Sequence, residues 1–233
     1  MKMSKLPVMV SILLLSGLSA QGANAWGWSG LEWSKSDGWK NGGAEFDCTW
    51  KANNIWTENG RLVLLAKNDG GYKTCGELRS TRYMRRGRYE VQMSAAGVPG
   101  TITSFFTYTG TAGTSSHYEV DIELMGGTNL LHTNVWIGGV QHPMDIDVGQ
   151  YGLSIWKMER YAFSIDAYGV TWQVFSRDTN EWVTVRRVDR PVTSYMQLFM
   201  NNWISANPSF PPSSYNDMPA YGKYDYVGFS PWE

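Results

Sequence analysis

The sequence predicts an all-β protein, a sandwich or a barrel, for three reasons. The chain of 233 residues contains many short runs rich in aromatic and β-branched side chains. Turn-forming residues lie between many of these runs, and no window shows the sustained 3.6-residue periodicity of a surface helix. In chain order, we expect strands at residues 61–66, 88–93, 102–108, 118–124, 132–137, 161–165, 170–175, 182–188 and 195–201.

Turn residues separate the expected strands. Asn59-Gly60, Gly126-Gly127 and Gly138-Gly139 are typical of tight turns. The segment 206–221 holds four prolines, which predicts an ordered surface loop. We find no internal repeat and no linker, and the length suits one domain spanning residues 26–233.

Residues 1–25 have the features of a secretory signal peptide. Lys2 and Lys5 give a positive start, residues 8–18 form an apolar run, and Ala23-Asn24-Ala25 is a small-x-small cleavage site. A membrane anchor is the alternative, but the run is short for a span. We therefore expect a secreted protein, extracellular or periplasmic, that does not associate with a membrane after cleavage.

The charge balance argues against nucleic-acid binding. The formal net charge is −1, and loss of the two lysines in the first 25 residues makes it about −3. The basic residues gather only once, in a cluster that predicts a solvated strand edge or turn rather than a ligand contact: Arg82, Arg85, Arg86 and Arg88.

Cysteine and aromatic contents fit an exported protein. Cys48 and Cys75 favour a disulfide, with two buried free thiols as the alternative, and three widely spaced histidines fit no zinc pattern. The chain has 12 Trp and 13 Tyr. Such side chains fill protein cores, but they also stack on sugar rings, and composition alone does not separate these roles.

One expected strand carries a row of charges. In the stretch HYEVDIELMG, Glu119, Asp121 and Glu123 alternate with apolar residues. Alternate residues of a strand share a face, so the carboxylates are expected to face solvent or a cleft and the apolar residues the core. Neighbouring carboxylates about 7 Å apart repel by roughly 2 kcal/mol at an effective dielectric near 20. A row of like charges with this repulsion needs an explanation.

Three explanations fit this row. An exposed edge strand would let water and salt screen the repulsion, and a calcium ion would be bound by carboxylates. A retaining glycosidase would use two of them, one as the nucleophile and one as the acid/base, at about 5–5.5 Å. The central Asp would then help to keep one Glu protonated.

The motif E-x-D-x-E, followed by an apolar pair and Gly, resembles the active-site strand of glycoside hydrolase family 16. The resemblance extends in order over most of the residues after 25 and is most similar to the bacterial lichenases, which are endo-β-1,3-1,4-glucanases. The matching segments are residues 46–54, 75–81, 87–91, 104–110, 200–203 and 224–227.

This resemblance implies a β-jelly roll sandwich of two curved antiparallel sheets with a concave glycan-binding cleft. It also implies hydrolysis of a β-glucan by double displacement with retention of configuration. Glu119 matches the nucleophile, Glu123 the acid/base and Asp121 the assisting carboxylate. The regular spacing matches lichenases and plant xyloglucan endotransglycosylases, whereas members with E-x-D-x-x-E have a bulge.

Other positions match residues of the lichenase cleft. Glu77 and Arg79 match ligands of sugar hydroxyls, with a structural ion pair as the alternative. The remaining matches, for which core packing is the alternative to an aromatic contact with sugar, are Phe106, Tyr108, Asn134, Trp136, Asn201 and Trp203.

The resemblance also bears on cofactors and partners. Cys48 and Cys75 match the lichenase disulfide. Catalysis should need no cofactor, although Asp225 matches a position near a structural calcium site, with a surface carboxylate as the alternative. The expected partner is a polysaccharide, either a β-glucan or an exopolysaccharide, and the protein is expected to act as a monomer.

Departures from the lichenase pattern affect the substrate more than the chemistry. Tyr118 replaces the usual Asp but should point away from the cleft. His117 is more similar to the transglycosylases and the exopolysaccharide-trimming glucanases, and the loops 140–160 and 204–220 are this chain's own. Two alternatives to a hydrolase therefore remain, a transglycosylase and a non-catalytic carbohydrate-binding matrix protein.

Overall fold

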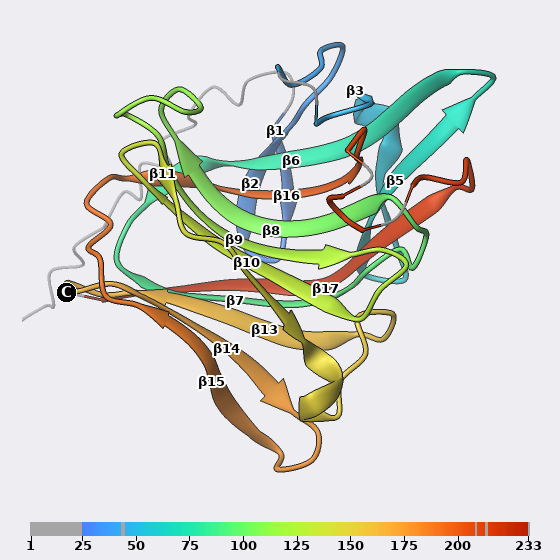
Figure 1. The fold of residues 1–233 in the computed structure, drawn as a ribbon. Helices are drawn as coiled ribbons and strands as arrows, with labels where there is room; N and C mark the ends of the chain where they lie inside the picture. Colours follow the sequence, from blue (N-terminus) through green and yellow to red (C-terminus); the bar gives the residue numbers. More distant parts are fainter. Residues whose placement is uncertain (1–24, 43–44, 208, 213, 233) are drawn as a thin grey trace, which may run out of the picture.

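The structure is a computed structural model that describes residues 25–42, 45–207, 209–212 and 214–232. In that part of the chain, two curved and almost entirely antiparallel sheets form a sandwich (Figure 1). The predicted signal peptide lies outside the described residues, except for Ala25 at its end.

The first sheet carries the acidic strand near one side. Its strands, in order, are β1 (Ala25–Trp28), β2 (Leu31–Lys35), β6 (Tyr72–Met84), β16 (Met196–Ile204), β8 (Thr101–Thr109), β9 (Tyr118–Met125) and β10 (Leu130–Ile137). Two short strands pair with β10, namely β11 (Val140–Gln141) and β12 (Met144–Asp147).

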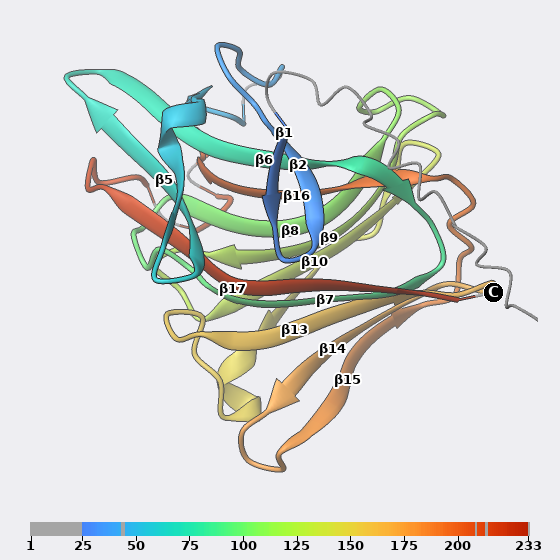
Figure 2. The ribbon, with the colours of Figure 1, turned by 180° about the vertical axis from the view of Figure 1, so that it is seen from behind.

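The second sheet lies across the first. Its strands, in order, are β4 (Ile55–Glu58), β5 (Arg61–Asp69), β17 (Ala220–Pro231), β7 (Gly87–Ser94), β13 (Glu159–Ile165), β14 (Val170–Ser176) and β15 (Glu181–Val188). From behind, β17 and β7 run through the middle of this sheet (Figure 2). The strand β3 (Thr49–Trp50) and the 3-10 helices η1 (Ala52–Asn54) and η2 (Val148–Tyr151) complete the described elements.

All nine predicted strands are present, with ends shifted by up to three residues. Several further strands were not predicted, and the longest of them are β6 and β17. The described residues of the proline-rich segment, 206–207, 209–212 and 214–219, form a loop, as expected, and Ala220 begins β17.

The main core lies between the sheets. Ile122 of β9 and Phe105 of β8 pack there with Tyr161 and Trp172 of the second sheet, and all four side chains are almost fully buried. A smaller cluster at one end contains Trp50, Trp203 and the disulfide between Cys48 and Cys75, whose Cα atoms are 5.8 Å apart. The predicted disulfide is therefore present.

The arginine cluster spans the turn between β6 and β7, as predicted, but it is less solvated than expected, because Arg85, Arg86 and Arg88 are partly buried. Arg82 is exposed, whereas Arg88 lies over the Trp182 ring at 4.3 Å and donates to Glu90. None of the described helices has the length and apolar character needed to span a membrane.

Candidate active site

The acidic strand is β9, and it separates its two sets of side chains as its alternation predicts. Val120, Ile122 and Leu124 are buried in the main core. Glu119, Asp121 and Glu123 line a cleft of about 1030 Å³ on the opposite face of the first sheet. The strand is not at an edge, because β8 and β10 pair with it on either side.

The register of the sheet places each carboxylate in a row of neighbours. Glu119 lies between Tyr108 and Trp136, and Asp121 between Phe106 and Asn134. Glu123 lies between Ser104 and His132. Beyond β8, the rows continue through β16 into β6, where Asn201 pairs with Glu77 and Phe199 with Arg79.

Every residue predicted to contact sugar lines this one cleft. They come from four strands besides β9 and are Glu77, Arg79, Phe106, Tyr108, Asn134, Trp136, Asn201 and Trp203. The structure thus brings together residues that are up to 126 positions apart in the chain, from Glu77 to Trp203.

Burial and mutual repulsion shift the proton equilibria of two carboxyl groups. Asp121 is 4% exposed, and burial, followed by the charges of Glu119 and Glu123, raises its pKa well above the ordinary value. Burial of Glu123 by surrounding protein, together with the charge of Glu119, raises its pKa to about 8. Glu123 is therefore mostly protonated near neutral pH, and the raised pKa of Asp121 also favours its neutral form, so both shifts lower the repulsion within the row.

Hydrogen bonds orient the three carboxyl groups. Asp121 is hydrogen-bonded to Glu119, and Ser104 Oγ donates to Glu123 Oε1 at 3.2 Å. His117 Nε2 lies 2.6 Å from Glu119 Oε2. Behind the strand, the Trp172 indole N–H donates to the backbone oxygen of Asp121 at 2.8 Å. The second sheet thereby anchors the middle of the row.

Trp203 differs from the stacking platform that the resemblance implies. It is 3% exposed, and its ring stacks on Phe46 with centroids 4.2 Å apart. Its side chain is also hydrogen-bonded to Glu123. Trp203 therefore presents an edge and a donor to the cleft, while its ring belongs to the smaller core cluster.

The other polar residues of the cleft are partly committed within the protein. Glu77 accepts hydrogen bonds from Ser36 and Asn201, at 2.7 and 3.3 Å. Asn134 Oδ1 accepts from the His142 amide at 3.0 Å, which ties β10 to the turn after β11. Arg79 is exposed and is the one of this group that extends openly into the cleft.

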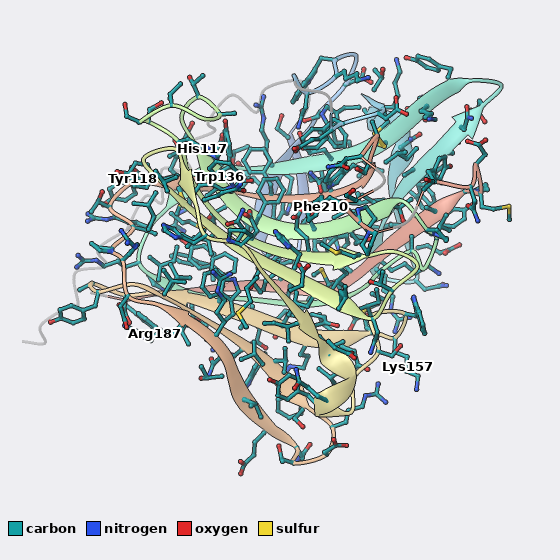
Figure 3. The ribbon with its side chains drawn as sticks, in the orientation of Figure 1. His117, Tyr118, Trp136, Lys157, Arg187 and Phe210 are labelled. Atoms are coloured by element: carbon teal, nitrogen blue, oxygen red, sulfur yellow. A yellow bond between two sulfur atoms is a disulfide. The ribbon has the colours of Figure 1, made fainter. Side chains whose placement is uncertain are left out.

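Several residues of the cleft escaped prediction. Trp39 and Glu45 belong to a loop without an obvious pattern, Phe46 begins a segment that resembles the family but had no role assigned, and Phe210 comes from the proline-rich segment. His132 also lies there, with its Nδ1 2.6 Å from Asp145 Oδ1. Figure 3 shows His117 and Trp136 close together at one end of the sheet, with Phe210 further along it. The three-dimensional fold brings these residues to the cleft, and no local motif in the sequence indicates that position.

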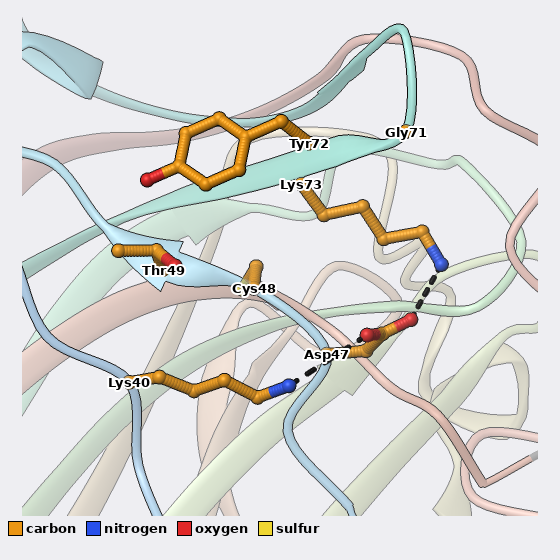
Figure 4. Close-up of a pocket in the computed structure, with 7 residues that line it drawn as sticks. All are labelled: Lys40, Asp47, Cys48, Thr49, Gly71, Tyr72 and Lys73. Atoms are coloured by element: carbon orange, nitrogen blue, oxygen red, sulfur yellow. Dashed lines mark hydrogen bonds and ion pairs between the residues drawn. The ribbon is translucent and has the colours of Figure 1, made fainter.

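No group of three or more potential metal ligands occurs among the described residues. Asp225, the expected neighbour of a calcium site, is on β17 and pairs with Arg61 at 2.8 Å. A smaller hollow lies beside the disulfide, where Asp47 is held between Lys40 and Lys73 (Figure 4). The two lysines of this hollow already pair with Asp47, so the large cleft is the better candidate site.

Comparison with known proteins agrees with this geometry. The family model described as glycosyl hydrolases family 16 matches residues 42–221. A β-glucanase of Paenibacillus polymyxa is 34% identical over 204 residues, covering 85% of this chain and 82% of that protein. A Bacillus subtilis β-glucanase is 31% identical over 203 residues, covering 85% and 81%.

Solved structures agree as well. The Bacillus licheniformis β-glucanase superposes with a TM-score of 0.76 and 28% identity, covering 91% of this chain and 94% of that one. A lichenase derived from a mouse hindgut metagenome superposes with a TM-score of 0.75 and 28% identity, covering 91% and 95%. Both comparisons extend across the two sheets and the cleft.

Proposed function

Because the chain belongs to glycoside hydrolase family 16, we propose that it is a secreted, retaining endo-β-glucanase whose reaction takes place on β9. The observation that carries this proposal is the placement of Glu119 and Glu123 on one face of β9, in a large cleft, with Asp121 between them and with the pKa of Glu123 raised. A glycosidase needs one ionised and one protonated carboxyl group beside the bond it cleaves.

In the first step, Glu119 attacks the anomeric carbon of the sugar. Glu123, whose pKa is raised to about 8, gives its proton to the leaving oxygen as the glycosidic bond breaks. A covalent glycosyl ester on Glu119 results. Asp121 holds Glu119 in place through their hydrogen bond.

In the second step, Glu123 accepts a proton from water, which attacks the same anomeric carbon. Glu119 leaves as a carboxylate, and two inversions give net retention. Arg79, Glu77 and Asn134 are the proposed contacts for sugar hydroxyls, and Phe106, Tyr108 and Trp136 the proposed aromatic walls. The proposed substrate is a β-1,3-1,4-linked glucan or a related β-glucan or exopolysaccharide.

The first test is product analysis with mixed-linkage β-glucan, laminarin, xyloglucan and an acidic bacterial exopolysaccharide. The wild-type protein should release short oligosaccharides from one of them, and proton NMR during the reaction should show the β-anomer first. Glu119→Gln should lower turnover by roughly three orders of magnitude or more, with the fold and glycan binding retained.

Glu181→Gln is the matched control, because Glu181 is exposed on β15 in the second sheet. Its activity should equal that of the wild type. Full activity of Glu119→Gln would refute the nucleophile, and an α-anomer as the first product would refute retention. Transfer to sugar acceptors in preference to water would instead support a transglycosylase.

A further inference from the structure

We propose that His117 is a positioning residue for the reaction, which orients Glu119 for its attack through a single donated hydrogen bond. The inference rests on the proposed function, because it assumes that Glu119 is the nucleophile. The inference gives a role to His117, which lies two positions before Glu119 and departs from the lichenase pattern in the sequence.

The hydrogen bonds of His117 fix which nitrogen carries the proton. The Gly113 amide donates to Nδ1 at 3.2 Å, so Nδ1 acts as an acceptor. The proton of the neutral ring is therefore on Nε2, which lies 2.6 Å from Glu119 Oε2. His117 thus donates to the carboxylate, and the tautomer is set by the loop rather than by the substrate.

The ring of His117 is held on both sides. It stacks on Trp136 with centroids 4.6 Å apart, and the Tyr108 ring lies at 5.2 Å. The side chain is only 3% exposed. Trp136 and Tyr108 are also the cross-strand neighbours of Glu119, so the same two aromatics enclose both members of the pair.

The loop that carries His117 is rigidly built. The His117 amide donates to the Thr114 oxygen, and the Thr114 amide to the Thr111 oxygen. The Gly139 amide in turn donates to the His117 oxygen at 3.1 Å, which joins the loop to the turn after β10. A donor on such a loop keeps its position when the cleft fills with substrate.

Two donors on one carboxylate restrict its rotation. Asp121 approaches Glu119 from along the strand and His117 from the end of the strand. Removal of the His117 donor leaves Glu119 free to turn about its terminal bonds, and a small misplacement of a reacting atom can cost about a hundredfold in rate. The effect should appear in the covalent step rather than in glycan binding.

The other cleft histidine has a different partner. His132 pairs with Asp145 through Nδ1 and lies across the strand from Glu123. Among the described residues, the hydrogen bond from a histidine ring to Glu119 comes from His117 and not from His132. The proposed role therefore belongs to His117 alone.

The experiment measures how fast Glu119 is labelled by an activated aryl 2-deoxy-2-fluoro-β-glycoside of an oligosaccharide from the polymer that the wild type cleaves in the product analysis. His117→Phe keeps an aromatic ring between Trp136 and Tyr108 but has no donor. Its labelling rate should fall by about ten- to a hundredfold, while the Kd of an unreactive oligosaccharide changes by less than about twofold. His117→Gln, which can place an amide N–H near the same point, should recover part of the rate.

His142→Gln controls for the loss of a histidine, because His142 is half-buried, is not among the residues that line the cleft, and forms its hydrogen bonds to Asn134 and Arg186 through its backbone. It should be labelled at the wild-type rate. If His117→Phe does not fold, the comparison of His117→Gln with His117→Met serves instead, since the two side chains are similar in length and only Gln has a donor.

The outcomes separate the inference from the function on which it rests. Labelling of His117→Phe at the wild-type rate overturns the inference and leaves Glu119 as the nucleophile. An equal loss in the Gln and Met variants also overturns it, because the ring rather than the donor would then matter. Labelling of Glu119→Gln, or no labelling of the wild type, overturns the proposed function and the inference together.

Discussion

Glu77 shows what burial does to a single carboxyl group in this cleft. It is 2% exposed, and that burial raises its pKa to about 7, although Ser36, Asn201 and Arg79 act in the opposite direction. In the unfolded chain the same group titrates near 4.5. Between these two pH values the folded protein binds one more proton than the unfolded chain, so its stability must fall as pH rises.

Replacement of Glu77 by Gln should remove this dependence. The wild-type free energy of unfolding should fall on the order of 3 kcal/mol from this group between pH 4.5 and 7, and the slope for Glu77→Gln should be correspondingly smaller. Urea unfolding at several pH values measures both slopes. The exposed Glu181→Gln should behave as the wild type, and equal slopes in all three proteins would contradict the assignment.

The sequence could predict the carboxylates because their chemistry and their two-residue spacing are local. It could not assign their proton states, since burial raises the pKa of Asp121 and Glu123 only after β8 and β10 enclose them. The same limit applies to Trp203, whose burial against Phe46 depends on a loop far away in the chain. His117 was visible in the sequence, but its partner was not.

The two longest strands, β6 and β17, are the elements that were hardest to predict. In β6, Glu77, Arg79 and Arg82 interrupt the apolar alternation, and Gly76 lies where a Cβ would meet the Asn54 oxygen at 2.9 Å. In β17, Gly222 and Asp225 have the same effect on the pattern. The strands that were predicted bury one continuous apolar face, as β9 and β14 do. Charged residues and glycines within a strand thus obscure the periodicity on which strand prediction depends.

The turn into the loop of His117 should tolerate no side chain at Gly110. Its φ is +88°, and a Cβ there would lie 1.9 Å from the Ser116 oxygen. Gly60 has a similar φ of +80° in the turn between β4 and β5, but open space around it. The two positions share backbone strain and differ in steric contact.

We therefore expect Gly60→Ala to destabilise the protein by about 1 kcal/mol and Gly110→Ala by at least about 3 kcal/mol. Urea unfolding of both variants gives the comparison. Because Gly110 supports the loop of His117, its variant should also lose labelling at Glu119. Equal stabilities of the two variants would show that the loop adjusts and does not hold His117 rigidly.

At the scale of the whole molecule, the disulfide supports the end of the sandwich that holds the smaller core cluster. It joins Cys48, just before β3, to Cys75 near the start of β6, across 27 positions of sequence. Both residues pack in the cluster that contains Trp203. The segment between them includes η1, β4 and β5, so the bond fixes the start of the second sheet relative to the first.

Loss of this bond should lower the free energy of unfolding by about 3–4 kcal/mol on the chain-entropy model. The variant with Cys48→Ala and Cys75→Ala, unfolded in urea, measures the loss without adding buried polar groups. Wild-type protein with and without a reductant is the companion measurement. A change below about 1 kcal/mol in both would mean that packing alone fixes this end of the sandwich.

The position of β9 inside the first sheet has a consequence for how the protein loses activity. Both backbone edges of β9 are paired, its apolar side lies in the main core, and Trp172 bonds to it from the second sheet. Such amides exchange with solvent only when the whole domain opens. The reacting groups therefore sit in the most slowly exchanging part of the molecule, and heat should inactivate the protein in one cooperative event. Substitutions in the surrounding loops can then change which polymer fits the cleft, while β9 keeps its carboxyl groups in place.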